Sequence, residues 1–456
     1  MTAHGVLRNS MAFDLIVHNG TIITVNPAFE IIEAGMVCIK NGRIKRIEAK
    51  PVSLPLPNAD DVIDAKGGII MPGLVNTHTH LPMTLFRGLA DDLPLDVWLN
   101  EKIFPAERDH ITSDSVHWST LLACTEMLMS GITTCCDGYF LEGGVAAAVN
   151  EIGIRAVLGQ GVIDFPAPGV ANPEKNITTA RRYLKQWERR TPLITPSIFC
   201  HSPYTCSQKT LRNAKALTKE HGVLFQIHAA ETRNEWDQLQ TEQESTPIRF
   251  LDRIGVLDQN TLLVHCIWVS DDDIAIIAGR GAGVAHCPES NMKLASGISP
   301  VPKLLEAGIT VGLGTDGCAS NNNLDLFHEM DVTAKLHKAH TFEPTIMDAV
   351  TVLKMATIEG ARAIGLDRKI GSLEIDKQAD LIVLDTRKPH LVPMYHPVSH
   401  IVYTTAASDV NDVVVSGNIL IKDRKMIAID LDKIIDKVND IAFNVRIKGK
   451  KPIPNN

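Results

Sequence analysis

Eight apolar runs recur through the middle of the sequence, with helix-like stretches between them, and this alternation limits the possible folds most. A parallel strand that is covered on both faces is typically a continuous apolar run. Eight strand–helix units in succession predict an α/β fold, the closed (β/α)8 TIM barrel. The alternative is a doubly wound open sheet, but no G-x-G-x-x-G motif follows the first run. The eight runs are GIIMPGLVNTH, GITTCCD, GIRAVLGQG, LITPSIFCH, GVLFQIH, NTLLVHC, GAGVAHC and GITVGLGTD.

The two ends of the chain are rich in short β-type segments. Asn-Gly dipeptides at Asn19 and Asn41 separate such segments near the N-terminus, and this dipeptide is a strong signal for a hairpin turn. Similar segments follow Gly371. We therefore expect a small β-sandwich domain formed by both termini. The expected organisation is a flexible extension (1–10), the β-sandwich domain (11–68 and 372–430), the barrel (69–371), and a C-terminal helix and tail (431–456).

The composition excludes several classes of protein. A net charge of −8 without a basic stripe argues against nucleic acid or an anionic membrane as a partner. No apolar stretch reaches the ~18 residues of a membrane span, and the N-terminal residues lack the apolar block of a signal peptide. The nine cysteines include no C-x-x-C pair, which favours buried, reduced thiols. We expect a cytoplasmic protein.

Most of the predicted barrel strands end in a residue type that can bind a metal ion. The first ends in the H-x-H motif of His78 and His80, whose side chains share one face because side chains alternate along a strand. The C-terminal strand ends of a TIM barrel converge on the face that carries the active site. The joint pattern therefore predicts a shared metal site, although a lone histidine at a strand end is usually structural. The other strand-end residues are His201, His228, His265, His286 and Asp316.

Imidazoles together with a carboxylate suit zinc or a similar divalent ion, and a catalytic site keeps one position open for water. The sequence contains neither H-E-x-x-H nor the H-x-E and P-C-x-x-C pair of cytidine-type zinc deaminases. Glu231 follows His228 by three residues, where it can move a proton between water and substrate without binding the metal. Its structural alternative is a carboxylate that favours a helix start. The placement of His286 does not decide between a structural and a functional role.

The connection between the first two predicted strands is unusually long, from Leu81 to about Ile111. Loops of this length in a compact domain are often lids or binding loops. The segment contains LADDLPLDVWL, which combines carboxylates with large apolar side chains. We interpret it as a candidate substrate loop.

These motifs resemble the amidohydrolase superfamily, in its branch of 5-methylthioadenosine/S-adenosylhomocysteine deaminases and related chlorohydrolases. The resemblance runs from about Phe13 to Lys422. Its motifs are PGLVNTHTHLPMTLFRGLADDLPLDVWL, FCHSPYTCS, IHAAET, VHC, SNMKLASGISP, GLGTDGCASNNNLDLFHEM and GSLEIDKQADLIVLD. It implies hydrolytic deamination of the adenine moiety of 5′-methylthioadenosine, S-adenosylhomocysteine, adenosine or related nucleosides to the inosine form, with release of ammonia.

The resemblance also implies a role for individual residues. One divalent ion, Zn²⁺ in most members and Fe²⁺ as the alternative, would be held by His78, His80, His228 and Asp316. Asp316 would also accept a proton from the attacking water. Glu231 would carry a proton to the ring nitrogen of the substrate, and His265 would orient or polarise the water. The strand-four residue is a histidine and not a lysine that could be carbamylated, which implies one metal ion and not a bridged pair.

For substrate binding, the resemblance implies that Glu107 binds the ribose hydroxyls and that His201 contacts the purine. Trp98 is expected to line the pocket. The sequence departs from some relatives at Gln160, where an arginine can bind the homocysteine carboxylate. Because an amide lacks the bidentate ionic grip of arginine, we expect a weaker preference for S-adenosylhomocysteine over 5′-methylthioadenosine.

Two other functions stay open at this level. One is deamination or dechlorination of another heterocycle, such as a triazine, a pterin or guanine; Glu107 argues against it, because such substrates lack a ribose diol. The other is a non-catalytic barrel that binds a partner, but such proteins have usually lost metal ligands. The sequence leaves the oligomeric state open, and a homo-oligomer is compatible with the helical exterior.

Overall fold

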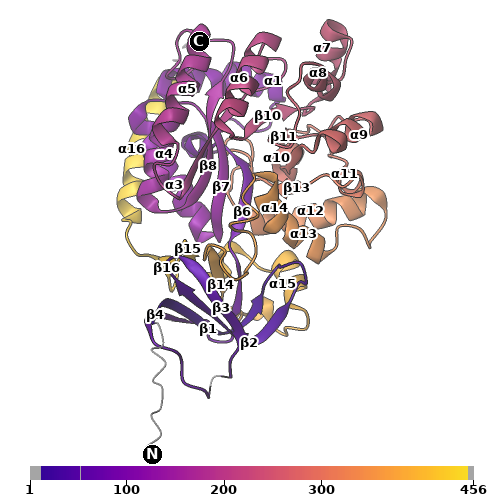
Figure 1. Ribbon diagram of the computed structural model, residues 1–456. Coiled ribbons are helices and arrows are strands. Elements are labelled where there is room, and N and C mark those ends of the chain that lie inside the picture. The colour runs from indigo at the N-terminus through magenta and orange to yellow at the C-terminus, as the bar shows by residue number, and fades with distance from the viewer. Residues whose placement is uncertain (1–11, 52, 450–456) are drawn as a thin grey trace, which may run out of the picture.

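The computed structural model describes residues 12–51 and 53–449. The predicted flexible extension (1–10) and the last residues of the predicted tail lie outside the described residues. Figure 1 shows two stacked parts, a barrel surrounded by helices and a sheet to which both ends of the chain contribute. Within the part of the chain that the structure describes, no helix is long and apolar enough to cross a membrane.

The eight predicted runs form eight consecutive parallel strands, and the predicted barrel is confirmed. Each strand hydrogen bonds to the next in chain order, and the last strand lies against the first. All eight strands are almost fully buried, as their continuous apolar sequences require. The strands are β6 (Leu74–Thr79), β7 (Ile132–Tyr139), β8 (Arg155–Val162), β9 (Ile194–Cys200), β10 (Phe225–Ala229), β11 (Thr261–His265), β12 (Gly283–His286) and β13 (Val311–Leu313).

Helices follow the strands and cover the outside of the barrel (Figure 1). Many begin at a side-chain cap: Ser207, for example, accepts a hydrogen bond from the backbone N–H of Thr210. The helices are α3 (Ser113–Met129), α4 (Glu142–Ile152), α5 (Asn176–Trp187), α6 (Gln208–His221), α7 (Arg233–Gln243), α8 (Pro247–Arg253), α9 (Asp271–Arg280), α10 (Pro288–Lys293), α11 (Val301–Glu306), α12 (Leu326–Thr341), α13 (Ala349–Met355), α14 (Ile358–Ala363), α15 (Pro397–Tyr403) and α16 (Leu431–Gly449). The C-terminal helix α16 packs against α3.

The β-rich ends of the chain form one mixed sheet, in the order β17-β16-β15-β14-β5-β1-β2-β3, with β4 paired to β1. A shared apolar core joins the N-terminal and C-terminal strands; Leu15, Val37, Leu381 and Val414 belong to it. The strands are β1 (Phe13–Ile23), β2 (Ile31–Lys40), β3 (Arg43–Ala49), β4 (Ala59–Asp64), β5 (Ile69–Pro72), β14 (Leu381–Leu384), β15 (Val410–Val415), β16 (Asn418–Lys422) and β17 (Lys425–Met426). Both termini therefore form one domain, as predicted, but its strands form a single mixed sheet. The prediction placed residues 69–72 in the barrel, whereas β5 belongs to this sheet because it pairs with β1 and β14.

Of the two predicted hairpin turns, one is confirmed. Asn41 and Gly42 have φ values of 52° and 70° and connect the antiparallel strands β2 and β3. The prediction at Asn19-Gly20 is wrong, because both residues lie inside β1 at an irregularity in its pairing with β2. A Cβ at Gly20 would lie 2.9 Å from the carbonyl oxygen of Gly68, so this glycine permits a close approach of two backbones.

A buried ion pair joins the barrel to the terminal sheet. Arg155, the first residue of β8, donates to both carboxylate oxygens of Asp380 at 2.6 and 3.0 Å, and it also donates to Ser416 Oγ at 2.6 Å. The two paired side chains are only 4% and 2% exposed. This bidentate ion pair therefore fixes the orientation of the sheet relative to the barrel.

We expect Asp380→Ala to lower the free energy of unfolding by about 3–5 kcal/mol, because it leaves the buried guanidinium of Arg155 without its counter-charge. Chemical denaturation would measure this. Lys303→Ala is the control, because Lys303 and its ion-pair partner Asp271 are 60% and 82% exposed. For this variant we expect the free energy of unfolding to fall by less than about 1 kcal/mol. Equal losses in the two variants would contradict the prediction.

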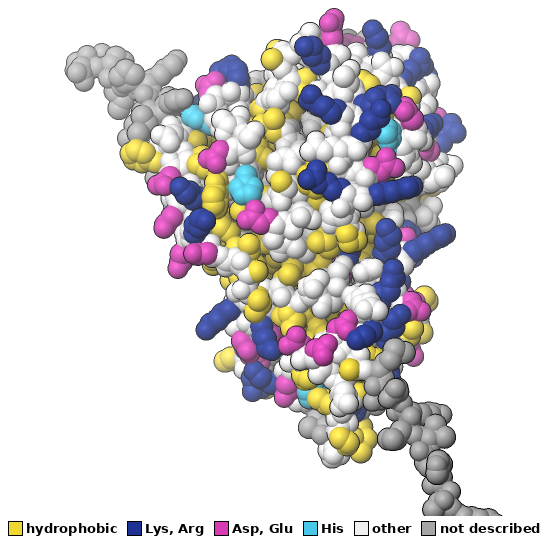
Figure 2. All heavy atoms as spheres, turned by 60° about the vertical axis from the view of Figure 1, so that its left-hand side comes forward, with side chains coloured by type: hydrophobic (Ala, Val, Ile, Leu, Met, Phe, Trp, Pro, Cys, Tyr) yellow, Lys and Arg dark blue, Asp and Glu magenta, His cyan; other side chains and the backbone are white. Residues whose placement is uncertain are grey.

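On the face shown in Figure 2, basic and acidic side chains are interspersed, and no continuous basic stripe runs over it. All nine cysteines are buried and unpaired, as their spacing predicted.

Candidate active site

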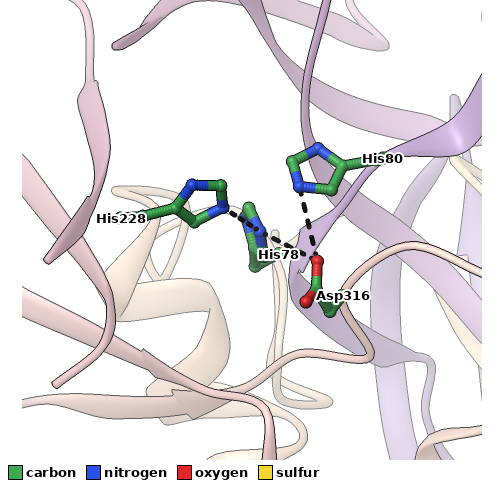
Figure 3. Close-up of side chains that lie close together, drawn as sticks. All are labelled: His78, His80, His228 and Asp316. Atoms are coloured by element: carbon green, nitrogen blue, oxygen red, sulfur yellow. Dashed lines mark hydrogen bonds and ion pairs between the residues drawn. The ribbon is translucent and has the colours of Figure 1, made fainter. Parts of the chain in front are cut away.

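Four of the predicted metal ligands meet at the C-terminal ends of the barrel strands (Figure 3). His78 comes from β6, His80 follows it, His228 comes from β10, and Asp316 follows β13. One ligand atom from each residue lies within 4.8 Å of the other three. Residues far apart in the sequence thus converge, as the barrel topology predicts.

Three of the spacings between these atoms match those of neighbouring ligands on one small divalent ion. His78 Nε2 lies 3.2 Å from His228 Nε2 and 3.4 Å from Asp316 Oδ1, and His80 Nε2 lies 3.3 Å from the same oxygen. Two ligands that each lie about 2.0–2.1 Å from a tetrahedral zinc ion are about 3.3 Å apart. His80 Nδ1 lies 2.6 Å from the carbonyl oxygen of Gly138, so it donates there and leaves the Nε2 lone pair for the ion.

The electrostatics of the cluster also suit a cation. Burial lowers the pKa of His78 to about 4 and holds the pKa of His228 well below its ordinary value, so both imidazoles are neutral at pH 7. Burial raises the pKa of Asp316, but the hydrogen bond from His78 and the neighbouring histidines outweigh it and hold that pKa well below the usual range. Neutral imidazoles and an ionised carboxylate are the protonation states that bind a metal.

The Asp316 carboxylate is held in place by two hydroxyl groups. Ser290 Oγ donates to Asp316 Oδ2 at 2.7 Å, and Ser320 Oγ donates to the same oxygen at 2.9 Å. The backbone N–H of Gly317 donates to Oδ1 at 2.8 Å. These bonds fix the orientation of the carboxylate toward the three imidazoles.

Two further titratable groups lie beside the cluster. His265, at the end of β11, has its Nε2 3.8 Å from Glu231 Oε1. Its Nδ1 lies 2.9 Å from Asn291 Oδ1 and donates to it. Burial raises the pKa of Glu231 above its ordinary value. Glu235 accepts the backbone N–H groups of Ala230 and Glu231 at 2.9 and 2.8 Å and so holds the turn that carries Glu231.

The backbone is strained where these strands end. Ala230, His265 and Asp316 have φ values of 55°, 76° and 61°, in the left-handed region that residues with a Cβ rarely adopt. Such strain costs about 1–3 kcal/mol per residue and concentrates at functional sites. Here it turns the chain sharply at the points where the side chains must face one another.

The long segment between β6 and β7 covers this site. It is mainly helical and not an irregular loop, because it contains a 3-10 helix (Leu81–Phe86), α1 (Leu95–Val97), a π-helix (Trp98–Ile103) and α2 (Phe104–His110). Its side chains line the cavity above the metal cluster, as expected of a substrate segment; they are Met83, Leu95, Trp98, Leu99, Phe104 and Glu107.

Glu107 is buried in the wall of this cavity. It is 3% exposed and accepts a hydrogen bond from Tyr139 Oη at 2.6 Å. Burial raises the pKa of Glu107 to about 7, and the bond from Tyr139 opposes this rise. A carboxylate that lacks a buried counter-charge is well suited to accept hydrogen bonds from the hydroxyl groups of a neutral ligand.

His201 and Trp98 also line the cavity, and this position is the one expected of Trp98. His201 Nδ1 lies 2.9 Å from Thr205 Oγ1, and burial lowers the pKa of His201 to about 3. Its imidazole is therefore neutral and can both donate and accept. Phe199 packs against the cluster, with its ring centroid 5.0 Å from that of His228.

Gln160 requires a correction, because the structure does not place its side chain in the cavity. Gly161 and Val162 of β8 line the cavity, whereas the side chain of Gln160 points to the outside of the barrel. There it lines a separate pocket beside α4 and α5 and donates to the carbonyl oxygen of Gly161 at 3.2 Å. The predicted substrate contact of Gln160, and the substrate preference inferred from it, therefore have no structural basis.

His286 lies outside the cluster. Its Nε2 is 3.3 Å from the Nε2 of His337 on α12, and both side chains are 1% exposed. This contact favours the structural role.

Sequence reasoning missed several residues that hold the site together. Tyr139 is the last residue of β7, in the run DGYF, and so stands at a strand end like the other site residues. This position could have identified it as a candidate. Asn291 and Ser290 lie in the SNMKLASG motif, which was noticed without a role for either side chain. Glu235 carried no signal, because a glutamate in the first turn of a helix is common.

A model of the amidohydrolase family matches residues 69–420, which include the entire barrel and all four clustered ligands. The chain belongs to the amidohydrolase family. The resemblance inferred from the sequence motifs is thereby confirmed. Several curated relatives cover nearly the whole of this amidohydrolase. A 5-methylthioadenosine/S-adenosylhomocysteine deaminase from Syntrophobacter fumaroxidans is 45% identical over 433 residues, which are 95% of this chain and 98% of the relative.

A 5′-deoxyadenosine deaminase from Methanosarcina mazei is 42% identical over 430 residues, 94% of this amidohydrolase and 98% of the relative. Among solved structures, an adenosine deaminase from Xanthomonas campestris with bound zinc has a TM-score of 0.93 and 35% identity, and the match covers 96% of this chain and 99% of that one. An atrazine chlorohydrolase from Arthrobacter aurescens, complexed with zinc, has a TM-score of 0.87 at 21% identity over 94% and 100% of the two chains, and it shares the fold.

Proposed function

We propose that this amidohydrolase hydrolytically deaminates the adenine ring of nucleosides with a small or extended 5′ group, such as 5′-methylthioadenosine, 5′-deoxyadenosine, adenosine and S-adenosylhomocysteine. Water adds at C6 of the ring and ammonia leaves, which gives the inosine-type product. The observation that carries the proposal is the cavity that joins a metal-binding cluster to the buried carboxylate of Glu107. The substrates named for the curated relatives support the same class.

His78, His80, His228 and Asp316 would hold one divalent ion, and we propose Zn²⁺ because three imidazoles and a carboxylate suit it. The zinc bound in the Xanthomonas campestris relative supports this choice. When bound, the ion lowers the pKa of water at its open position toward neutrality and so supplies a hydroxide nucleophile.

The proton transfers are assigned to one residue of the cluster and to residues beside it. Asp316 accepts a proton from the attacking water. Glu231, whose pKa is raised by burial, carries a proton to N1 of the adenine ring and so favours addition at C6. His265, oriented by Asn291, hydrogen bonds to the water and holds it in line with the ring.

Glu107 would accept the ribose hydroxyls, His201 would hydrogen bond to the purine, and Trp98 would pack against the substrate. A heterocycle without ribose would leave the buried Glu107 without a partner, which costs binding energy. This argument favours nucleosides over triazines, pterins and guanine.

Tyr139 sets the ionisation of Glu107, and this can be tested by pH. Below about pH 7 Glu107 takes up a proton and becomes a poorer hydrogen-bond acceptor for the ribose hydroxyls. The preference for a ribonucleoside over its 2′,3′-dideoxy analogue should therefore fall. Tyr139→Phe removes a bond that lowers the pKa of Glu107, so this fall should begin at higher pH. The measurement is the ratio of kcat/KM for the two substrates across pH 5–9.

Tyr183→Phe is the matched control, because Tyr183 is buried and donates to the carbonyl oxygen of Leu158, outside the cavity. An unchanged pH profile in Tyr139→Phe would exclude the assignment.

The proposed function itself is tested by ammonia release from the zinc-loaded protein. The substrates are 5′-methylthioadenosine, 5′-deoxyadenosine, adenosine, S-adenosylhomocysteine, guanine and a chlorotriazine. Turnover confined to the adenine nucleosides is the expected result. Turnover of guanine or the triazine alone would overturn the proposal.

A further inference from the structure

A second, larger cavity adjoins the one that contains the metal cluster. Its volume is about 820 Å³. The two cavities share five lining residues, which form the neck between them: Leu95, Leu99, Phe104, Tyr204 and Leu294. We call the larger cavity the outer chamber. A substrate with its adenine at the metal cluster and its ribose at Glu107 can extend its 5′ group through this neck into the outer chamber.

The neck and the outer chamber differ in chemistry. Four of the five neck residues are apolar, which suits a thioether sulfur and its flanking carbons. The outer chamber also has polar and charged walls, among them Asp92, Asp96 and Arg233. A methylthio group would end within the neck, whereas a longer substituent would reach the charged walls.

Arg233 is held in place for binding an anion. Its guanidinium carbon lies 4.7 Å from the ring centroid of Trp236 and 5.4 Å from that of Trp268. Trp268 is fixed in turn by its Nε1, which donates to the carbonyl oxygen of Ser296 at 2.9 Å. Two aromatic faces restrict the guanidinium plane, so less entropy is lost when it binds a carboxylate.

The hydrogen bonding of Arg233 leaves its outer edge free. Its Nε donates to Asp237 Oδ1 at 3.0 Å, and in the described part of the chain the two Nη groups have no hydrogen-bond partner. Those two groups form the edge that binds a carboxylate in bidentate fashion. Both side chains of this pair are 55% exposed, so water screens their attraction and Asp237 cancels the charge of Arg233 only in part.

The other cation in the chamber wall is already engaged. Lys293 Nζ donates to Asp91 Oδ1 and Asn322 Oδ1, each at 2.6 Å. In contrast, the carboxylates of Asp92 and Asp96 have no hydrogen bond or ion pair to any described residue. The outer chamber therefore offers one available cation and two available anions, which complements the carboxylate and the ammonium group of an α-amino acid.

We infer that the outer chamber is the subsite for a 5′ substituent that ends in an α-amino acid, with Arg233 binding its carboxylate and Asp92 and Asp96 attracting its ammonium group. This inference rests on the proposed function and extends it to substrate selection. It reverses the preference expected from Gln160: the chain has a cation for the homocysteine tail, but places it on the first residue of α7, after β10, and not on β8. Arg233 is thus a specificity residue and takes no part in the chemical step.

The test compares Arg233→Gln with the wild-type, zinc-loaded enzyme on three substrates. These are S-adenosylhomocysteine, 5′-methylthioadenosine, and 5′-(3-aminopropylthio)-5′-deoxyadenosine, which is the homocysteine compound without its carboxylate. We expect the ratio of kcat/KM for S-adenosylhomocysteine to that for 5′-methylthioadenosine to fall about tenfold or more, chiefly through KM, because a charge-assisted bidentate contact is lost. The same ratio for the decarboxylated compound should change less than about twofold.

Arg249→Gln is the matched control, because it removes an exposed arginine on the neighbouring helix α8 that pairs with Asp272 and does not line the chamber. It should keep the wild-type ratio. If Arg233→Gln weakens the homocysteine compound and its decarboxylated analogue equally, or weakens neither, the inference is overturned. If the wild-type enzyme fails to deaminate 5′-methylthioadenosine, the proposed function fails and the inference falls with it.

Discussion

Replacing Glu231 by Gln is expected to lower kcat by about 10³-fold or more, since a positioned general acid–base group contributes on the order of 10²–10⁴-fold and the amide cannot deliver a proton to the ring nitrogen. The metal content should stay near one ion per chain, because Glu231 is not among the four clustered ligand atoms. The measurements are steady-state ammonia release and metal analysis of the same preparation.

The control is Glu242→Gln, an exposed change on α7 whose carboxylate accepts a hydrogen bond from Gln238. Like the change at Glu231, it removes one negative charge, but at a position on α7 away from the cavity. It should keep the wild-type kcat. If Glu231→Gln retained most of its rate, the proton transfer would have to be assigned to another group, such as His265, whose Nε2 lies 3.8 Å from Glu231 Oε1.

Replacing His80 by Ala is expected to reduce bound metal to below one-tenth of an ion per chain and to lower kcat/KM by more than about 10³-fold, because the nucleophile depends on the metal. It should also lower thermal stability. A ligand present at about 100 times its Kd contributes about 2.7 kcal/mol to the stability of the folded state. Treatment of the wild-type enzyme with a chelator should produce the same two losses, and added zinc should reverse them.

His340→Ala is the comparison, because His340 is an exposed residue of α12 and lies outside the cluster. It should keep both the metal and the activity. A His80→Ala variant with a full metal complement would show that the ion lies elsewhere, and an active metal-free enzyme would overturn the mechanism.

The cavity that contains the metal cluster, called here the inner cavity, and the outer chamber have different roles. The inner cavity holds the groups proposed for the reaction, and its walls are buried and rigidly hydrogen bonded. The outer chamber is wider and carries exposed charges, so it can accept substituents of different lengths. This division gives a physical reason why one catalytic site can serve nucleosides that differ only at the 5′ position.

Much of this fold was determined by the sequence alone, because its signals are local. A buried parallel strand must be a continuous apolar run, and eight such runs alternating with helical stretches leave little choice but a barrel. The same reasoning predicted a shared metal site at the strand ends, and the family resemblance selected its four ligands. His78, His80, His228 and Asp316 stand at strand ends, and the topology of a barrel brings strand ends together whatever lies between them in the sequence.

Only the tertiary structure decided the direction of individual side chains. The position of Gln160 in its strand was predicted closely, but a shift of one residue turns a side chain from the inside of the barrel to the outside. Tyr139 and Glu107 are 32 residues apart, and their hydrogen bond depends on how the helical segment after β6 folds over the barrel. The guanidinium of Arg233 contacts the indole rings of both Trp236 and Trp268, and it reaches both only because α7 and the turn after β11 are adjacent in space. Sequence patterns report which face a residue prefers, whereas these contacts depend on the packing of whole elements against one another.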